Sequence, residues 1–360
     1  MCEMTRTFYP VGQGAFYSEI FFEDKFTMIY DCGSYKNKEI IENKLANSNL
    51  KKVINLVVIS HFHEDHINGL EYLLSNYQVE RLLLPFLHNE EKIELFLHNS
   101  NDFAKKICLN PIDTVKNTSA NKKIQIIQVD FEEDNKSEPV SIDDIPVKIP
   151  SGTKIKINCN EKNMDWLYIP FNFRFNERSQ KLKELFLKEK IPLEIKSFIQ
   201  SYEKNKHKII SFYREIKGDM NTNSLVLYSG PSKKHVEKSV GNNLFCLCLD
   251  NRVGCLYLGD FNAKGNQKWN QLKGVYEKYF ECIGTIQVPH HGSTHNYNKE
   301  LNFQKNLVSV ISAGINNQFN HPDASTLKEI VLKKGIPIVI TEKECTELIQ
   351  ELNYCSMYCI

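Results

Sequence analysis

The chain has 360 residues, of which 41% are hydrophobic and 25% charged, and these are ordinary values for a folded globular protein. Its formal net charge of +1 gives no general electrostatic attraction to nucleic acid or to an anionic membrane. The sequence lacks both an apolar run of about 18 residues and an apolar signal sequence. With eleven cysteines and no sign of secretion, it predicts a cytoplasmic protein with reduced thiols and no membrane partner.

The first ninety residues predict alternating strands and helices. Residues 5–35 indicate strands joined by tight turns, and residues 36–50 indicate a short polar helix. Residues 53–59 are nearly all apolar and rich in β-branched side chains, as is typical of a strand buried on both faces. Apolar residues then recur at helical spacing up to Tyr77, and residues 78–87 indicate the next strand of the same βαβ unit.

Residues 90–218 show a mixed pattern, which predicts a large α/β insertion within a single domain of residues 1–360. The aromatic, strand-like residues 166–175 could stack nucleobases, but a place in the core is favoured. The lysine-rich stretch 176–218 is helical in character and is the best candidate for a lid or a protein-binding element. The alternative, which we prefer, is a solvated amphipathic helical pair. Basic clusters such as residues 204–208 could follow a nucleic-acid backbone or simply favour solubility.

The stretch HFHEDH, at residues 61–66, places four metal-binding side chains within six positions. His61 and His63 are two residues apart, so on an extended chain both side chains point to the same side. Asp65 and His66 begin the helical pattern that follows. The loop can therefore give two imidazoles to one metal ion, and a carboxylate with an imidazole to a second.

HFHEDH resembles the H-x-H-x-D-H motif of the metallo-β-lactamase fold superfamily. Other segments occur in the matching order: VGQG at 11–14, DCG at 31–33, an Asn-Ser pair at 223–224, GD at 259–260, HHGS at 290–293 and HP at 321–322. This order is most like the competence-protein type of metallo-β-lactamase domain. The resemblance implies an α/β protein, a four-layer αβ/βα sandwich, with a dinuclear metal site.

The resemblance also implies a metal-binding role for five of these residues. His61 and His63 would bind one metal ion and Asp65 and His66 the other, while Asp260 would bridge both. The nitrogen and oxygen donors favour Zn²⁺ for the two divalent ions, with Mn²⁺ as the alternative.

Further residues leave alternatives open. His290 is our choice for the remaining ligand, because it directly follows a predicted strand. His291 and His321 are catalytic candidates that would orient or protonate the substrate, although either histidine could instead bind metal. Asn223 is a third catalytic candidate; it lies where many relatives carry another histidine ligand, so one metal ion would have few protein ligands. Asp31 is expected to hydrogen-bond the metal-binding histidines rather than to bind metal.

A hydroxide held between two metal ions is suited to phosphodiester hydrolysis. We therefore predict a metal-dependent hydrolase, a phosphodiesterase or nuclease, that acts on DNA, another nucleic acid or a nucleotide diester. One alternative is a metallohydrolase of a small ester, thioester or lactone. Another is a catalytically silent scaffold, against which the intact ligand set weighs. By analogy of fold, a stand-alone enzyme of this type with its own insertion also suggests a defence-type effector.

Overall fold

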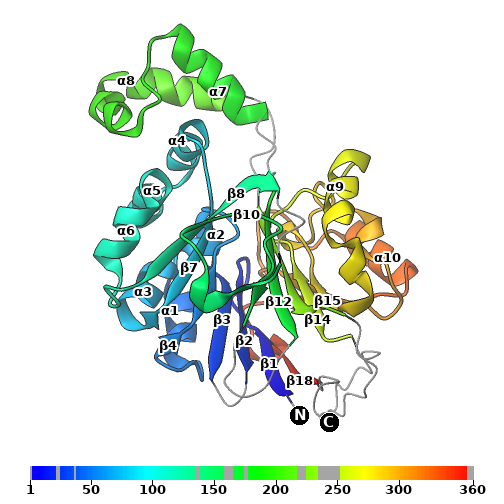
Figure 1. The fold of residues 1–360 in the computed structure, drawn as a ribbon. Helices are drawn as coiled ribbons and strands as arrows, with labels where there is room; N and C mark the ends of the chain where they lie inside the picture. Colours follow the sequence, from blue (N-terminus) through cyan, green and yellow to red (C-terminus); the bar gives the residue numbers. More distant parts are fainter. Residues whose placement is uncertain are drawn as a thin grey trace.

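Two β-sheets face each other, and helices cover the outer side of each sheet (Figure 1). The computed structural model describes residues 2–21, 25–35, 38–133, 138–157, 165–173, 177–216, 224–233 and 252–354. Within these residues the layers follow in the order helices, first sheet, second sheet, helices. This order confirms the four-layer αβ/βα sandwich that the sequence predicts.

The first sheet combines the N-terminal part of the chain with its last strand. In spatial order, its strands in the described residues are β10 (Lys148–Ser151), β8 (Gln125–Glu133), β7 (Arg81–Pro85), β5 (Leu56–Val58), β3 (Phe26–Cys32), β2 (Phe16–Phe21), β1 (Cys2–Phe8) and β18 (Leu348–Tyr354). The strands from β3 to β10 are parallel, whereas β2, β1 and β18 add antiparallel neighbours. A short parallel pair, β4 (Val53–Ile54) with β6 (Gln78–Val79), forms a separate small sheet.

The second sheet is built from the later part of the chain. In the described residues its strands are β17 (Ile336–Ile340), β16 (Val308–Ser312), β15 (Ile283–Gln287), β14 (Gly254–Tyr257), β13 (Leu225–Pro231), β12 (Trp166–Asn172), β11 (Ile155–Lys156) and β9 (Val140–Ser141). The strands from β14 to β17 are parallel, so their carboxyl ends lie at one edge of the sheet.

Side-chain alternation explains why the central strands are continuous apolar runs in the sequence. In β5, Leu56 and Val58 face the core between the sheets, whereas Val57 faces the helices. In β14, Tyr257 faces the same central core and Leu256 faces the helices on the other side. Both strands are thus buried on two faces, as parallel strands in a layered α/β fold usually are.

The helices form two outer layers and one separate group. The first sheet is covered by α1 (Lys38–Asn47), α3 (Leu70–Asn76), α5 (Asp102–Leu109) and α6 (Pro111–Thr118), and the second by α9 (Asn266–Tyr276) and α10 (Ala324–Leu332). A further apolar cluster joins α4 (Asn89–His98), α7 (Glu177–Lys188) and α8 (Ile195–Glu215), at the top of Figure 1. Shorter turns are α2 (Glu64–Ile67), η1 (Ile142–Asp144), η2 (Glu277–Cys282), η3 (His290–Gly292), η4 (Lys299–Leu301) and η5 (Glu344–Thr346).

Parts of residues 90–218 belong to the two sheets. β8 and β10 extend the first sheet, and β12 lies in the second. Tyr168, Phe171 and Phe173 are buried, so they belong to the core and do not offer a base-stacking surface. The predicted insertion, as a lid or partner-binding element, stays a prediction, and α7 and α8 are the part of this span that stands outside the four layers (Figure 1).

The single strand predicted over residues 53–59 is wrong in detail. The structure instead has β4 and β5, separated by Asn55, and Val53 is 39% exposed. The Asn55 side chain accepts a hydrogen bond from the backbone N–H of Thr27 at 2.8 Å and donates one to Glu80 at 3.1 Å. A polar residue with side-chain partners of its own therefore divides the apolar run.

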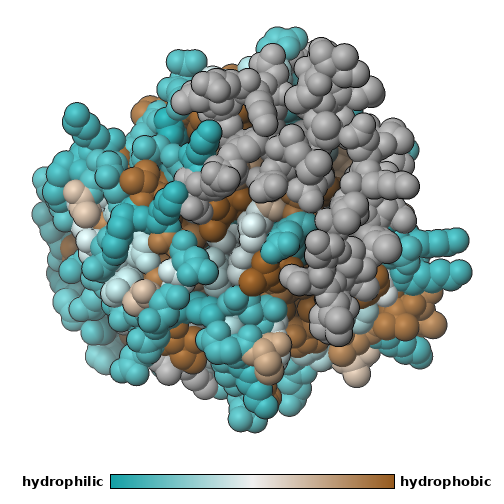
Figure 2. Space-filling view, turned by 90° about the horizontal axis from the view of Figure 1, so that it is seen from below, coloured by the Kyte–Doolittle hydropathy of each residue, from teal (hydrophilic) through white to brown (hydrophobic). Residues whose placement is uncertain are grey.

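The helices, the surface and the cysteines are those of an ordinary globular domain over the described residues. None of the described helices is both long and apolar enough to cross a membrane. Seen from the end that carries the chain termini, the described surface is mainly hydrophilic with small apolar patches (Figure 2). Among the described residues, the free thiols are Cys32, Cys108, Cys255, Cys282 and Cys345.

Candidate metal centre

The candidate ligands lie where strands of both sheets end at one edge of the sandwich. β5 leads into His61, β14 into Asp260, and β15 into His290 and His291. β16 leads into the loop that carries His321. Residues that are far apart in the sequence meet because the carboxyl ends of these parallel strands open onto the same crevice.

The H-x-H-x-D-H loop is compact. The ring centroid of His61 lies 4.6 Å from that of His63 and 4.1 Å from that of His66. The DCG segment packs directly against this loop, since a Cβ atom at Gly33 would lie 2.4 Å from the backbone carbonyl of Asp65. Only a glycine allows so close an approach of two backbones.

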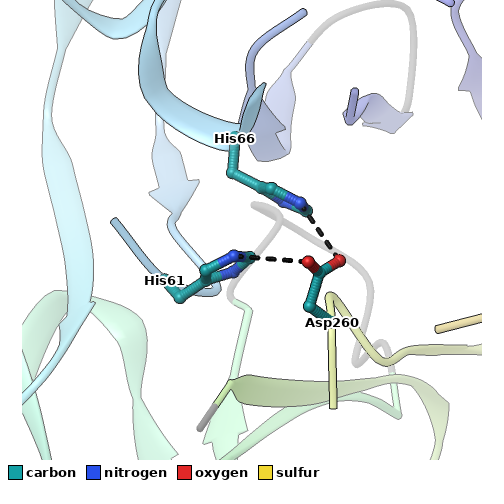
Figure 3. A group of neighbouring side chains, drawn as sticks. All are labelled: His61, His66 and Asp260. Atoms are coloured by element: carbon teal, nitrogen blue, oxygen red, sulfur yellow. Dashed lines mark ion pairs between the residues drawn. The ribbon is translucent and has the colours of Figure 1, made fainter. Parts of the chain in front are cut away.

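Two groups of side chains have potential ligand atoms within 4.8 Å of one another. In the first, Asp260 Oδ1 lies 3.2 Å from His66 Nε2, and Asp260 Oδ2 lies 3.6 Å from His61 Nε2 (Figure 3). In the second, His291 Nε2 lies 3.2 Å from Asp65 Oδ2, with His66 beside them. The two oxygens of Asp260 therefore face different histidines, as a bridging carboxylate requires.

Several buried atoms of the centre lack hydrogen bonds. The Nε2 atoms of His61, His63 and His66 are buried without a hydrogen bond, and so is Oδ1 of Asp260, whose close contact with His66 lacks hydrogen-bond geometry. A buried polar atom without a partner costs roughly 1–3 kcal/mol. A divalent cation would satisfy these atoms together, and their imidazole and carboxylate chemistry suits zinc or manganese. The residues present therefore fit metal binding.

The histidines of the two groups are each held through Nδ1, which leaves Nε2 directed to the centre. This is the usual arrangement of metal-binding histidines. The Nδ1 contacts are His61 with Ser60 Oγ at 2.9 Å, His66 with Asp31 Oδ2 at 2.8 Å, and His291 with the backbone oxygen of Ser312 at 2.8 Å.

Asp31 anchors the H-x-H-x-D-H loop through contacts with Ser60 and His66. Its Oδ1 accepts from the backbone N–H of Ser60 at 2.7 Å, and its Oδ2 accepts from the Ser60 hydroxyl at 2.7 Å and contacts His66. Asp31 has a φ of 56°, a left-handed conformation that costs a non-glycine residue about 1–3 kcal/mol. This geometry is the one expected for the supporting role predicted from the sequence.

Asp260 is positioned by its neighbours on both sides. Gly259 has a φ of 53°, and a Cβ atom there would lie 2.7 Å from the Cβ of Ser60. The Gln287 side chain accepts from the backbone N–H of Gly259 at 2.7 Å, and the Ser224 hydroxyl accepts from that of Asp260 at 3.1 Å. Sequence reasoning missed Gln287, because its role depends on contacts between neighbouring strands.

The structure distinguishes His290 from His291. Both have positive φ values, 48° and 53°, which are uncommon in histidine and cluster at functional sites. His291 belongs to the group with Asp65 and His66. His290 belongs to neither group, and its Nε2 lies 3.9 Å from Asp260 Oδ2. Of the two histidines, His291 is therefore the one that lies among other candidate ligands, whereas the choice of His290 as the remaining ligand stays a prediction.

Two other predicted residues in the described part of the chain, His321 and His63, stand outside the two groups. His321 Nδ1 lies 3.7 Å from Asp323 Oδ2, and its ring centroid lies 5.8 Å from that of His290. His63 contacts His61 but joins neither group. Asn223 lies outside the described residues, so its predicted catalytic role stays a prediction.

A cleft opens beside these side chains. None of the described residues that line it is a lysine or an arginine. Phe319 is 46% exposed. Its position two residues before His321 is the sequence signal that could have indicated a place for Phe319 in the cleft. Besides the candidate ligands, the lining includes Gln13 of the VGQG segment, together with Tyr35, His98, Asn262, His295 and Phe319, which lie outside the sequence motifs.

The surroundings of three candidate ligands shift their pKa values in the direction that favours metal binding. Burial alone would raise the pKa of Asp65, but His66 and the hydrogen bond with His291 lower it to about 2. Burial lowers the pKa of both His61 and His63 well below the usual value. These three side chains therefore have the protonation state of metal ligands at neutral pH.

Loading the metal-free protein with Zn²⁺ at pH 7 should release roughly one to two protons per chain. Burial would lower the pKa of His66, but Asp260 and Asp31 raise it well above the usual value. Burial is similarly outweighed at His291, whose pKa is raised by the hydrogen bond to Asp65. Both histidines must lose this proton to bind metal, so the affinity should increase as the pH rises through neutrality.

Calorimetric titrations in buffers of different ionisation enthalpy measure this proton release. His291→Ala should lower the number of released protons by about one. Zinc binding with no proton release would contradict the protonation of both histidines.

Comparisons with known proteins found one family model and several solved structures that match the chain. The family model described as "Anti-Pycsar protein Apyc1" matches residues 14–133, about a third of the chain, including the H-x-H-x-D-H loop. The crystal structure of the metallo-beta-lactamase fold protein YhfI from Bacillus subtilis is similar over 97% of this chain and 99% of that chain, with 9% identity and a TM-score of 0.41. No curated protein matches. The competence-protein type finds no support here. By the order of its layers and the place of its ligand loop, the chain has a metallo-β-lactamase fold.

Proposed function

We propose that the chain is a metal-dependent phosphodiesterase that hydrolyses a cyclic nucleotide, rather than a nuclease that acts on a strand. The observation that carries this choice is the cleft, which among its described residues has histidines, carboxylates, amides and aromatic rings but no lysine or arginine. A protein that follows a nucleic-acid backbone needs several cationic side chains along its path. A single phosphodiester needs only the metal centre and a few hydrogen-bond partners.

An aromatic pair beside the centre supports a nucleotide substrate. Phe319 and Tyr35 meet edge to face with ring centroids 5.8 Å apart, and Gln318 donates a hydrogen bond to the Tyr35 hydroxyl at 2.9 Å. Phe319 leaves part of its ring exposed in the cleft. An exposed ring binds the face of a nucleobase with little preference for its identity.

The chain's own residues divide the work in this proposal. When bound, two divalent ions would neutralise charge on the phosphate and activate a water molecule for attack. Asp260 would position both ions, because its two oxygens face different histidines. Burial, together with His290 and His291, lowers the pKa of His321 to about 4, so this side chain is neutral at pH 7. It is therefore suited to orient the phosphate by a hydrogen bond rather than to deliver a proton.

The partial family match is compatible with this substrate class. The matched model is described as an anti-Pycsar protein, and the match includes the ligand loop at residues 61–66. It is also compatible with the defence-type role suggested by the sequence.

A substrate panel tests the proposal. With Zn²⁺ or Mn²⁺, the protein should open 3′,5′-cyclic nucleotides and leave DNA and RNA intact. The rate on cyclic nucleotides should change little between 50 and 200 mM salt, whereas binding through six to ten backbone phosphates would weaken by roughly 10³–10⁵. Cleavage of strands would restore the nuclease prediction. Hydrolysis of a lactone or thioester alone would favour the small-ester class, and no hydrolysis of any substrate would favour a silent scaffold.

Phe319→Ala provides a matched control for the nucleobase contact. It should raise KM for a cyclic nucleotide by roughly 10-fold, since stacking on one base contributes about 1–3 kcal/mol. It should leave KM for the corresponding abasic ribose 3′,5′-cyclic phosphate, which has no ring to stack, within about twofold.

A further inference from the structure

One face of α4 is polar and contacts α7 and α8. Glu90, Glu94 and His98 follow at intervals of four residues, so they share a side of the helix. Arg178 of α7 forms an ion pair with Glu94, and Lys183 Nζ lies 3.4 Å from Glu90. These contacts accompany the apolar cluster that joins the three helices and set the position of α4.

The last of these residues lies at the metal centre. The ring centroid of His98 is 4.6 Å from that of His63, the same separation as between His63 and His61. His98 also lines the cleft that Asp65 and Asp260 line. Neither His63 nor His98 belongs to the two compact groups, so the two rings form a pair of their own next to His61.

Tyr213 of α8 holds His98 in a particular orientation. The Tyr213 hydroxyl lies 3.1 Å from His98 Nδ1, so Nε2 is the nitrogen left for another partner. The histidines of the two compact groups are anchored in the same way, through Nδ1. Arg178 stacks on the Tyr213 ring at 5.0 Å and donates to its backbone oxygen at 3.0 Å, which steadies the tyrosine.

The metal position predicted at His61 and His63, called the first metal position here, can take one more protein ligand. His61, His63 and Asp260 are its candidate protein ligands, and a tetrahedral zinc site takes three or four. The described residue that follows Asn223 is Ser224, whose hydroxyl already accepts from the backbone N–H of Asp260 and lies 3.5 Å from His61 Nδ1. Ser224 therefore positions Asp260 and His61, and it does not take the place of the histidine ligand that many relatives carry near this point.

We propose that His98 is the third imidazole ligand of the first metal position, supplied by α4 and oriented by Tyr213 of α8. This inference rests on the metal centre of the proposed function but not on its substrate. It gives the α7–α8 pair a role in completing the centre.

Cobalt spectroscopy of a cysteine variant tests the contact directly. His98→Cys loaded with two equivalents of Co²⁺ should show a thiolate-to-cobalt charge-transfer band that the wild-type protein lacks. His207→Cys, at an exposed position of α8, is the matched control and should show no such band. Circular dichroism verifies that each variant is folded. A folded, cobalt-loaded His98→Cys protein without the band would overturn the proposal.

Zinc affinity separates a ligand from a structural residue. His98→Gln keeps a polar side chain near Tyr213 but cannot replace an imidazole. The affinity for one of the two zinc ions should therefore fall by more than the roughly 10–100-fold that follows from losing a ligand's hydrogen-bond partner. His98→Cys should retain zinc, and Tyr213→Phe should lose roughly 10-fold in affinity. Wild-type affinity in His98→Gln would refute the ligand role.

These measurements use no substrate. A wild-type protein that binds two metal ions but opens no cyclic nucleotide would refute the proposed substrate, while the His98 result would still stand or fall on the cobalt band. A wild-type protein that binds no divalent metal would overturn both proposals.

Discussion

Asp260→Ala should lose most bound metal and all measurable hydrolysis while the protein stays folded. Asp260 is 2% exposed, and its two oxygens face His66 and His61 at 3.2 and 3.6 Å. Without this carboxylate, both proposed metal positions would lose their bridging ligand. The loss should therefore exceed the roughly 10–100-fold caused by removing a hydrogen-bond partner of a ligand. Metal analysis after gel filtration, together with the rate on a cyclic nucleotide, measures both effects.

Asp31→Asn is the graded control for this experiment. It preserves the size of the side chain behind His66 but removes its charge, so it should weaken metal binding within that 10–100-fold range. The fold should survive in Asp260→Ala because the carboxylate lies on a loop beyond β14, and the core is carried by the strands. Two bound metal ions in Asp260→Ala would refute the bridging role.

His321→Ala should keep its metal and lose roughly 10²-fold or more in kcat. His321 belongs to neither compact ligand group, yet it lines the same cleft. Its neutral ring is suited to hold the phosphate in line for attack, and misplacement of a reacting group by about 1 Å can cost roughly 10²-fold. Metal content and kcat, measured on the same sample, test this separation.

A second substitution at the same position distinguishes orientation from proton transfer. The amide of His321→Gln can donate a hydrogen bond but cannot deliver a proton, so this variant should recover part of the activity lost in His321→Ala. Equal loss in both variants, with metal retained, would assign His321 to proton transfer. Loss of metal in His321→Ala would instead make it a ligand.

Local features of the centre could be predicted from the sequence. His61, His63, Asp65 and His66 lie within six residues after a strand, so spacing alone brings them together. Asp260 could be predicted because a glycine-aspartate pair directly follows a strand. The fold followed from the order of such segments, since parallel strands place their carboxyl ends at one edge.

Features that depend on tertiary contacts could not be predicted. The choice between His290 and His291 depends on two consecutive positive φ values, which no local pattern indicates. His98 ends a helix in a span that the motifs do not reach, and its partner Tyr213 is 115 residues away. β8, β10 and β12 were included in a predicted insertion because their pairing partners are not visible from the sequence.

The assembly of the centre from both sheets has a consequence for synthesis of the chain. The H-x-H-x-D-H loop is complete at His66, but Asp260 follows roughly 190 residues later. At about 5–20 residues per second, the ribosome needs roughly 10–40 s to add that interval. During this time the nascent chain presents a histidine cluster without the carboxylate proposed to bridge the two metal positions, so the proposed centre could not yet form. The proposed two-metal centre could therefore be completed only after Asp260 has been synthesised, and an ion bound earlier by the loop would have to be re-coordinated when the second sheet forms.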